Sequence, residues 1–352
     1  MIKNITGKKD FIENLRGKSA TFLLALSNTQ TANIEGITQA GIPGMLHLTP
    51  TLDGEFVALG EVRSLANIAE TPKGVPTPAL ITRAIHLLNP YKNIEFLDLG
   101  LAIKPKVDYF KIHDFGIVPS GRIDEDANID ANSVFQKGLE FGQNYTTKDE
   151  YIILGESVPS GTTTANATAL ALGYDCKDKF SSSFKNVPNS IREVTINKAL
   201  ANIQEGDELF DILGTVSDNM IIFVAGFILG LNNRLPLILA GGTQMASVLL
   251  VVNKILEVME GQIDTSNLAL ATTKWVYEDK NSDIAGLLLM LGFPLNSYYA
   301  DFDFSLSQHL ALKLYDEGEA KEGVGAGGAL VYGALNGLTK ENITRKVEGF
   351  LG

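Results

Sequence analysis

The chain has 352 residues, a formal net charge of −12 at pH 7 and a pI of about 4.9. Apolar residues make up 45% of the sequence and charged residues 20%, the composition of a globular protein that can bury a large core. The acidic balance, without any extended basic cluster, argues against a nucleic-acid partner.

The sequence also lacks the usual signals for export, membrane insertion and metal binding. Residues 1–6 carry no apolar segment of a signal peptide, and the longest apolar run, 221–231, is about half of the roughly 20 residues that a membrane span needs. The single cysteine, Cys176, excludes an internal disulfide and a cysteine zinc site, and the four histidines show no metal-binding spacing. We therefore expect a cytoplasmic protein with no membrane partner, no metal and no cofactor, and a buried helix over 221–231.

In chain order, the predicted elements begin with a short helix over 8–15 and an apolar strand over 20–26. Loop-rich sequence follows to about residue 75, with one strand predicted at 55–59. A helix over 79–88 follows Pro76-Thr77-Pro78, because proline is tolerated in a first helical turn. From there, apolar runs at 93–98, 151–156, 235–242 and 268–273 are predicted as strands, and 162–172, 244–259 and 329–338 as helices.

Continuous apolar strands that alternate with helices indicate a doubly wound, mostly parallel, Rossmann-like α/β sheet. Ligands of such sheets bind beyond the carboxyl ends of the strands. In this chain those ends carry small, hydroxyl and acidic residues: Asp98, Gly155-Glu156, Gly241-Gly242-Thr243 and Thr272-Thr273.

The turn at 155–164 is the first candidate site. Small residues that lead into a helix present free N–H groups and the positive end of the helix dipole, and Ser160 with Thr162, Thr163 and Thr164 adds hydroxyl donors. A phosphate would suit this turn, although the lysine of a triphosphate-binding loop is absent. An ordinary Ser/Thr-capped turn is the alternative.

Two further glycine-rich segments are candidates. Ala240-Gly241-Gly242-Thr243 is again a strand, a glycine turn and a helix start, and either ligand approach or close helix–strand packing would explain it. Glu322 stands in glycine-rich surroundings that leave room for a flat substrate, and poor solvation could raise its pKa toward base function. A surface glutamate beside a flexible loop is the alternative for Glu322.

These segments, in this order, resemble the nicotinate mononucleotide:dimethylbenzimidazole phosphoribosyltransferases of cobalamin lower-ligand assembly, and the whole chain looks like their archaeal-type homologues. Leu154-Gly155-Glu156 followed by Thr162-Thr163 is similar to the family's GEMGIGNTT, and 321–328 is similar to its GEGxGA. Segments 76–83 and 239–245 add to the resemblance, which covers most of the chain from about residue 70. Two departures are Val158-Pro159-Ser160-Gly161 in place of GIGN and Asp98-Leu99-Gly100 in place of DHG.

The resemblance implies a homodimeric glycosyltransferase with a parallel sheet and a small helical domain built from both chain ends. We divide the chain accordingly into a large nucleotide- and base-binding domain, 40–285, and a smaller domain, 1–39 plus 286–352, that completes the active site. The implied reaction transfers phosphoribose from nicotinate mononucleotide to a benzimidazole-type base and gives an α-ribotide (α-ribazole phosphate) and nicotinate. The incoming imidazole must lose a proton, and the resemblance makes Glu322 the base.

The predicted substrate-binding residues are Asp98, Glu156, Ser160, Gly161, Thr162, Thr163, Thr164, Gly241, Gly242, Thr243, Thr272, Gly323 and Gly325. We expect the Lys321 side chain to point to solvent, and the base role to pass to Glu156 or Asp98 if Glu322 does not fill it. Two alternatives stay open, namely the same reaction with another acceptor base and a catalytically silent nucleotide-binding homologue.

Overall fold

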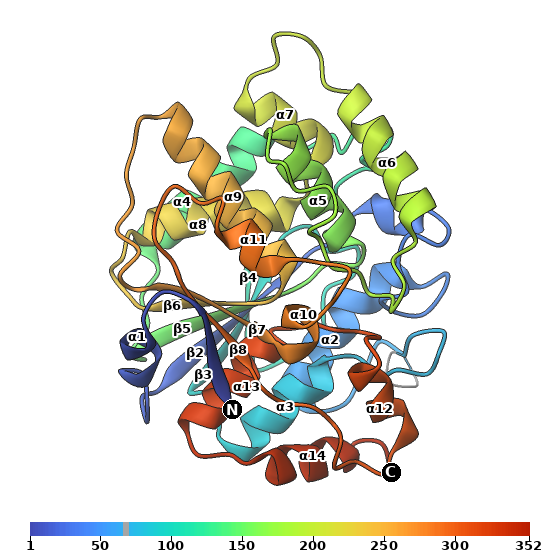
Figure 1. The fold of residues 1–352 in the computed structure, drawn as a ribbon, viewed down its shortest axis with the longest axis vertical. Helices are drawn as coiled ribbons and strands as arrows, with labels where there is room; N and C mark the ends of the chain where they lie inside the picture. Colours follow the sequence, from blue (N-terminus) through green and yellow to red (C-terminus); the bar gives the residue numbers. More distant parts are fainter. Residues whose placement is uncertain (66–69) are drawn as a thin grey trace.

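The computed structural model describes residues 1–65 and 70–352 and contains an eight-stranded sheet with helices on both faces (Figure 1). The strand order is β1-β8-β7-β6-β5-β2-β3-β4, and every neighbouring pair is parallel except β1 and β8. The predicted α/β fold class is therefore confirmed. The strands are β1 (Ile2–Thr6), β2 (Ala20–Leu26), β3 (Asn93–Asp98), β4 (Lys111–Asp114), β5 (Tyr151–Ser157), β6 (Leu237–Ala240), β7 (Leu268–Thr273) and β8 (Asn296–Ala300).

The central strands are buried on both faces, which is why they read as continuous apolar runs rather than as alternating patterns. Every residue of β2, β5, β6 and β7 is buried. Because β5, β6 and β7 run parallel, their carboxyl ends meet at one edge of the sheet. The turns after β5 and β6 lie at that edge, as predicted.

Two layers of helices cover the sheet, and alternate residues of the central strands β2, β5, β6 and β7 face one layer or the other. One layer includes α4 (Ala131–Asn144), α5 (Gly161–Ala171), α8 (Asn219–Leu231), α9 (Thr243–Val258) and α11 (Ile284–Leu288), with α6 (Asn189–Ala201) and α7 (Leu209–Val216) outside them. The other layer includes α2 (Thr49–Leu59), α3 (Ala79–Leu88), α12 (Leu310–Asp316), α13 (Ala326–Leu335) and α14 (Lys340–Glu348). Short helices complete the fold: α1 (Lys9–Glu13), α10 (Lys274–Tyr277) and the 3₁₀ turns Gln30–Asn33 and Leu46–Leu48.

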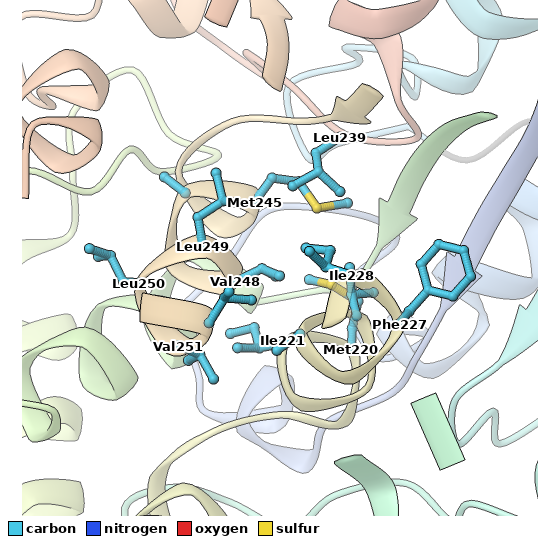
Figure 2. Close-up of a cluster of buried hydrophobic side chains, with 14 of the residues drawn as sticks. Met220, Ile221, Phe227, Ile228, Leu239, Met245, Val248, Leu249, Leu250 and Val251 are labelled. Carbon is cyan, nitrogen blue, oxygen red and sulfur yellow. The ribbon is translucent and has the colours of Figure 1, made fainter. Parts of the chain in front are cut away.

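The apolar helix predicted over 221–231 is α8, and it lies in the hydrophobic core (Figure 2). Its Met220, Ile221 and Ile228 pack against the Met245, Val248 and Leu249 face of α9. On its other side α8 lies close to α4, where a Cβ on Gly226 would stand 2.3 Å from the carbonyl oxygen of Phe135. Glycine is therefore needed where the two helix backbones approach each other.

The strand predicted at 55–59 is wrong, because these residues end helix α2. Pro50 lies in the first turn of α2, and all of its residues up to Ala58 are buried, including Asp53 and Glu55. The Glu55 carboxylate accepts bonds from the backbone N–H groups of Arg63, Ser64 and Lys106, which explains how it is buried inside a helix. A helix buried all round has no amphipathic pattern from which it could be predicted.

The segments assigned to the smaller domain contribute to the same sheet. Residues 1–39 supply β1 and β2, while 286–352 supply β8 and three helices of one layer. The division into two domains stays a prediction.

Candidate active site

A cleft opens beyond the carboxyl ends of the strands β5 and β6. Its empty volume, including the part open to solvent, is about 920 Å³. The turn after β5, the start of α9, residues 320–324 and the N-terminal half of the chain all contribute to its walls. The lining residues include Thr38, Gly41, Asp53, Glu70, Pro76, Thr77, Pro78, Glu156, Ser160, Gly161, Thr162, Ser181, Ser182, Ser183, Gly242, Thr243, Gln244, Lys321, Glu322 and Gly323.

Glu322 lines this cleft, with its carboxylate held by four donors. Oε1 accepts from the N–H groups of Gly323 (3.2 Å) and Gly327 (3.0 Å). Oε2 accepts from the Thr273 N–H (2.9 Å) and the Thr272 hydroxyl (3.1 Å). The end of β7 and the start of α13 therefore fix the orientation of this carboxylate.

Burial raises the pKa of Glu322 to about 7, although its four hydrogen bonds act in the opposite direction. Desolvation penalises the charged form, while donors stabilise it, and here desolvation is the larger effect. A carboxylate with a pKa near 7 is suited to take up and release a proton at neutral pH.

Glu156 and Asp53 also line the cleft, and burial shifts the pKa of both. Burial, together with the nearby charges of Glu322, Asp218 and Asp53, raises the pKa of Glu156 to about 8. Burial also raises the pKa of Asp53 to about 6, although its oxygens accept from the hydroxyls of Ser157 and Thr77, each at 2.6 Å. These carboxyls give the cleft a negative field once they ionise, so it favours a cationic group.

Glycines allow the segment that carries Glu322 to lie directly on the end of β5. A Cβ on Gly155 would stand 2.9 Å from the backbone of Gly325, and Gly325 itself has φ +71°. The Val324 N–H donates to the Glu156 carbonyl at 2.7 Å across this contact. The two glycine-rich motifs are therefore in contact, and their glycines allow the two backbones to come this close.

The starts of α5 and α9 meet in the wall of the cleft. Gln244, in the first turn of α9, lies so close to Gly161 that a Cβ there would stand 1.8 Å from its side-chain oxygen. The Gln244 oxygen and the Ser160 hydroxyl are buried and have no hydrogen-bond partner in the described part of the chain. Buried polar groups are normally paired, so these two are available to a ligand. Ser160 adopts φ +64°, which turns the chain into α5.

A loop that no sequence pattern singled out also lines the cleft, namely Ser181-Ser182-Ser183. The Ser181 N–H donates to the Thr243 hydroxyl at 3.2 Å, and the Ser181 hydroxyl donates to Asp279 at 3.0 Å. The loop is therefore tied to the start of α9.

Eight predicted site residues line the cleft: Glu156, Ser160, Gly161, Thr162, Gly242, Thr243, Glu322 and Gly323. The other six do not line it. Thr272 supports Glu322 from behind, Gly325 contacts Gly155, and the Thr164 hydroxyl donates to Asp218 at 2.5 Å. Thr163 and Gly241 are adjacent to lining residues, and Asp98 caps the turn after β3 by accepting from the N–H groups of Gly100 and Leu101.

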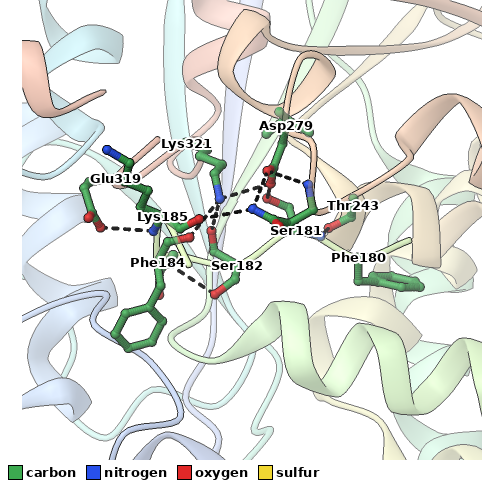
Figure 3. A network of polar contacts seen from close by, with 12 residues as sticks. Phe180, Ser181, Ser182, Phe184, Lys185, Thr243, Asp279, Glu319 and Lys321 are labelled. Carbon is green, nitrogen blue, oxygen red and sulfur yellow. Dashed lines mark hydrogen bonds and ion pairs between the residues drawn. The ribbon is translucent and has the colours of Figure 1, made fainter. Parts of the chain in front are cut away.

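The prediction that Lys321 points to solvent is wrong. Its side chain is buried and its ammonium group lies 3.0 Å from the Asp279 carboxylate (Figure 3). It also donates to the carbonyl oxygens of Ser182 (3.2 Å) and Phe184 (2.8 Å). No sequence pattern marked the partner, because Asp279 lies 42 positions away in an irregular segment.

The sequence left open whether the first 70 residues form part of the pocket, and it singled out no residue there. Thr38, Gly41 and Asp53 line the cleft from this part of the chain, and residues 76–78, at the start of the segment 76–83 that adds to the resemblance, form part of its wall. A buried aspartate inside a helix has no sequence signal of its own.

Within residues 1–65 and 70–352, no cluster of three or more His, Cys, Asp or Glu side chains has a geometry that could hold a metal ion. Over the same residues, no helix combines the length and the apolar character that crossing a membrane requires.

Comparison with known proteins gives relatives along the full length of the chain. The UPF0284 protein of Saccharolobus islandicus strain L.S.2.15 is 33% identical over 360 residues, covering 100% of this chain and 97% of the relative. The UPF0284 protein of Saccharolobus solfataricus is 34% identical over 352 residues, covering 99% and 96%. That of Sulfurisphaera tokodaii is 34% identical over 357 residues, again covering 99% and 96%. No protein-family model matches the sequence.

Two solved structures share the fold. The crystal structure of nicotinate-nucleotide-dimethylbenzimidazole phosphoribosyltransferase from Thermus thermophilus aligns with a TM-score of 0.60 at 17% identity, covering 95% of this chain and 83% of that one. The crystal structure of CobT from Thermus thermophilus aligns with a TM-score of 0.59 at 16% identity, covering 95% and 84%. At this identity the likeness is one of fold, and at that level it confirms the resemblance predicted from the motifs.

Proposed function

The chain belongs to the UPF0284 protein family, and from its fold and its cleft we propose that it is a pentosyltransferase of cobalamin lower-ligand assembly. It transfers phosphoribose from nicotinate mononucleotide to a benzimidazole-type base. The observation that carries this proposal is the position of Glu322, an oriented carboxylate with a pKa of about 7 that lines the same cleft as the starts of α5 and α9.

The phosphate of the donor belongs at the starts of α5 and α9 in this proposal. Thr162, Thr243 and the serine loop line that part of the cleft, and helix N-termini attract anions through free N–H groups and the helix dipole. The α9 start is the better of the two, because the Gly161 and Thr163 N–H groups at the α5 start already donate to the carbonyls of Val158 and Ser160.

The chemistry requires one bond to break, one to form and one proton to move. The unprotonated imidazole nitrogen attacks C1′ of the ribose, and the pyridinium leaves as neutral-ring nicotinate with the electrons of the glycosidic bond. The N–H on the other ring nitrogen, made acidic by the attack, gives its proton to Glu322. Displacement inverts the anomeric centre and yields the α-ribotide.

Three of the four donors to the Glu322 carboxylate are backbone N–H groups and the fourth is the Thr272 hydroxyl, so these contacts keep the carboxylate oriented while it takes up the proton. Glu156 and Asp53, once ionised, favour the positive charge that develops on the ribose ring.

The test is incubation with nicotinate mononucleotide and a panel of bases, with mass-spectrometric detection of new ribotides. The panel includes dimethylbenzimidazole, benzimidazoles with other substituents, and adenine. A ribotide with a benzimidazole supports the proposal, and a ribotide with adenine alone would keep the reaction but change the acceptor. No ribotide with any base, together with tight binding of the nucleotide, would favour the silent nucleotide-binding alternative.

A further inference from the structure

We infer that Lys321 and Asp279 form a positioning pair that couples the phosphate end of the cleft to the base Glu322. This inference rests on the proposed function, since it assigns a role within the same site. The pair is buried on both sides, at 4% and 3% side-chain exposure, and its two members come from different parts of the chain.

The Lys321 ammonium has three hydrogens, and each has an acceptor. These are the Asp279 carboxylate and the carbonyl oxygens of Ser182 and Phe184 (Figure 3). Because no hydrogen is left over, Lys321 does not bind the substrate directly in this arrangement. It fixes the serine loop against the segment that carries Glu322.

That segment adopts a backbone that needs support from outside. Ala320 and Val324, on either side of Lys321 and Glu322, both have positive φ, at 50° and 55°. Residues with a Cβ rarely adopt such angles unless the surrounding structure holds them there. Lys321 supplies one such anchor, and the Thr82 hydroxyl, which donates to the Val324 carbonyl at 2.7 Å, supplies another.

A second set of contacts just before Lys321 holds the same segment. The Glu319 carboxylate accepts from the ammonium of Lys73, the amide of Gln39 and the N–H of Lys185. Segment 319–322 therefore joins three loops that form the walls of the cleft. Of the cleft-lining residues that the structure describes, Lys321 is the one basic side chain.

The contacts continue from Lys321 to the start of α9. Asp279 accepts the hydroxyl of Ser181, and the Ser181 N–H donates to Thr243 in the first turn of α9. A phosphate bound at this turn would order Thr243 and Ser181, and through Asp279 and Lys321 it would hold Glu322 in place. Lys321 thus acts on the rate of transfer through the position of the base.

The experiment compares nicotinate mononucleotide with nicotinate riboside, which lacks the phosphate, in the wild type and in Lys321→Met. In the wild type the phosphate should raise kcat as well as lower KM. In Lys321→Met we expect kcat with the mononucleotide to fall about 10- to 100-fold, the scale of a small misplacement of a reacting group. The kcat advantage of the mononucleotide over the riboside should disappear in this variant, while its KM advantage remains.

A double variant separates an effect on the position of Glu322 from an effect on the stability of the fold. Lys321→Met leaves Asp279 as an unpaired buried carboxylate, so the variant should unfold more readily. Lys321→Met with Asp279→Asn removes both charges and keeps an acceptor for Ser181, so its Tm should return toward the wild-type value. In our account kcat stays low in the double variant, and a double variant as fast as the wild type would overturn the inference. Lys340→Met, which removes a partly buried ion pair with Asp303 outside the cleft, is the matched control.

Hydrogen exchange gives a readout that does not depend on transfer. Binding of nicotinate mononucleotide to the wild type should slow amide exchange in both 181–185 and 320–327, and in Lys321→Met it should slow exchange in 181–185 alone. Equal slowing of both segments in the variant would contradict the coupling. If no acceptor yields a ribotide but the exchange pattern is as expected, the proposed function fails and the coupling stands.

Discussion

The α8–α9 core and the loop network around Lys321 are both buried, but they are built in opposite ways. In the core, apolar side chains of two long helices pack on one another with no polar side chain required (Figure 2). In the network, a lysine, an aspartate, serines and backbone carbonyls from segments far apart in sequence satisfy one another (Figure 3). The core gains free energy from the area it buries, whereas the network gains mainly a defined geometry.

The contrast predicts different responses to substitution. Loss of a core side chain should lower stability and leave the chemistry of the remaining folded protein unchanged. Loss of a cleft contact should lower binding or rate by more than it lowers stability. Substitutions in each region therefore test whether the core and the network respond differently.

The largest effect is expected from Phe227→Ala in α8. Phe227 is fully buried and its ring lies 5.6 Å from that of Phe141 and 6.0 Å from that of Tyr145. Truncation of such a side chain leaves a cavity and typically costs about 3–5 kcal/mol of unfolding free energy. Urea unfolding should show this loss, whereas Val258→Ala at an exposed position should change the free energy by less than about 0.5 kcal/mol. Similar losses for both variants would mean that this core is not tightly packed.

A smaller effect is expected from Thr162→Val, which removes a hydroxyl from the wall of the cleft. Loss of a hydrogen bond to a charged group costs about 1.5–3 kcal/mol, so the KM for nicotinate mononucleotide should rise at least about tenfold. The KM for the riboside should change little, because it has no phosphate. Thr168→Val, in the same helix but bonded to the Thr164 carbonyl, is the control. An unchanged KM in Thr162→Val would place the phosphate at α9 alone.

The smallest effect concerns pH. Glu322 and Glu156 have pKa values raised to about 7 and about 8 in the folded protein, above the ordinary glutamate value of 4.5. The folded state therefore holds protons that the unfolded state has lost, and stability falls as pH rises through these values. Each group contributes at most about 1.4 kcal/mol per pH unit.

The window for this measurement is about pH 6.5 to 8.5, which spans the two raised pKa values. Below it, His86, whose folded pKa is lowered from 6.5 to about 4, acts with the opposite sign. Urea unfolding should show a stability that decreases across the window, with a smaller slope in Glu156→Gln. A stability that is constant or increases would mean that the carboxyls are already ionised in the folded protein.

The same contrast explains what the sequence could predict. Strands β2, β3 and β7 and helix α3 could be located from their apolar runs and flanking prolines or glycines, because those signals are local. Helix α2 could not, since it is buried all round and contains acids whose hydrogen-bond partners lie in other segments. Of the site, the two glycine motifs and Glu322 could be found because the backbone contact between Gly155 and Gly325 leaves a glycine signature. Asp53, the serine loop and the pairing of Lys321 with Asp279 depend on contacts between separate segments, which no spacing encodes.

The most direct test of the account compares Glu322→Gln with the wild type on two acceptors, benzimidazole and 1-methylbenzimidazole. Benzimidazole must lose an N–H proton, whereas the methylated acceptor has none to lose. With benzimidazole we expect kcat to fall roughly 10²-fold or more in Glu322→Gln, the usual scale of general-base contributions, with KM for the nucleotide little changed. With 1-methylbenzimidazole the variant should react at nearly the wild-type rate. An equal loss with both acceptors, or no loss with benzimidazole, would contradict the assignment of Glu322 as the base.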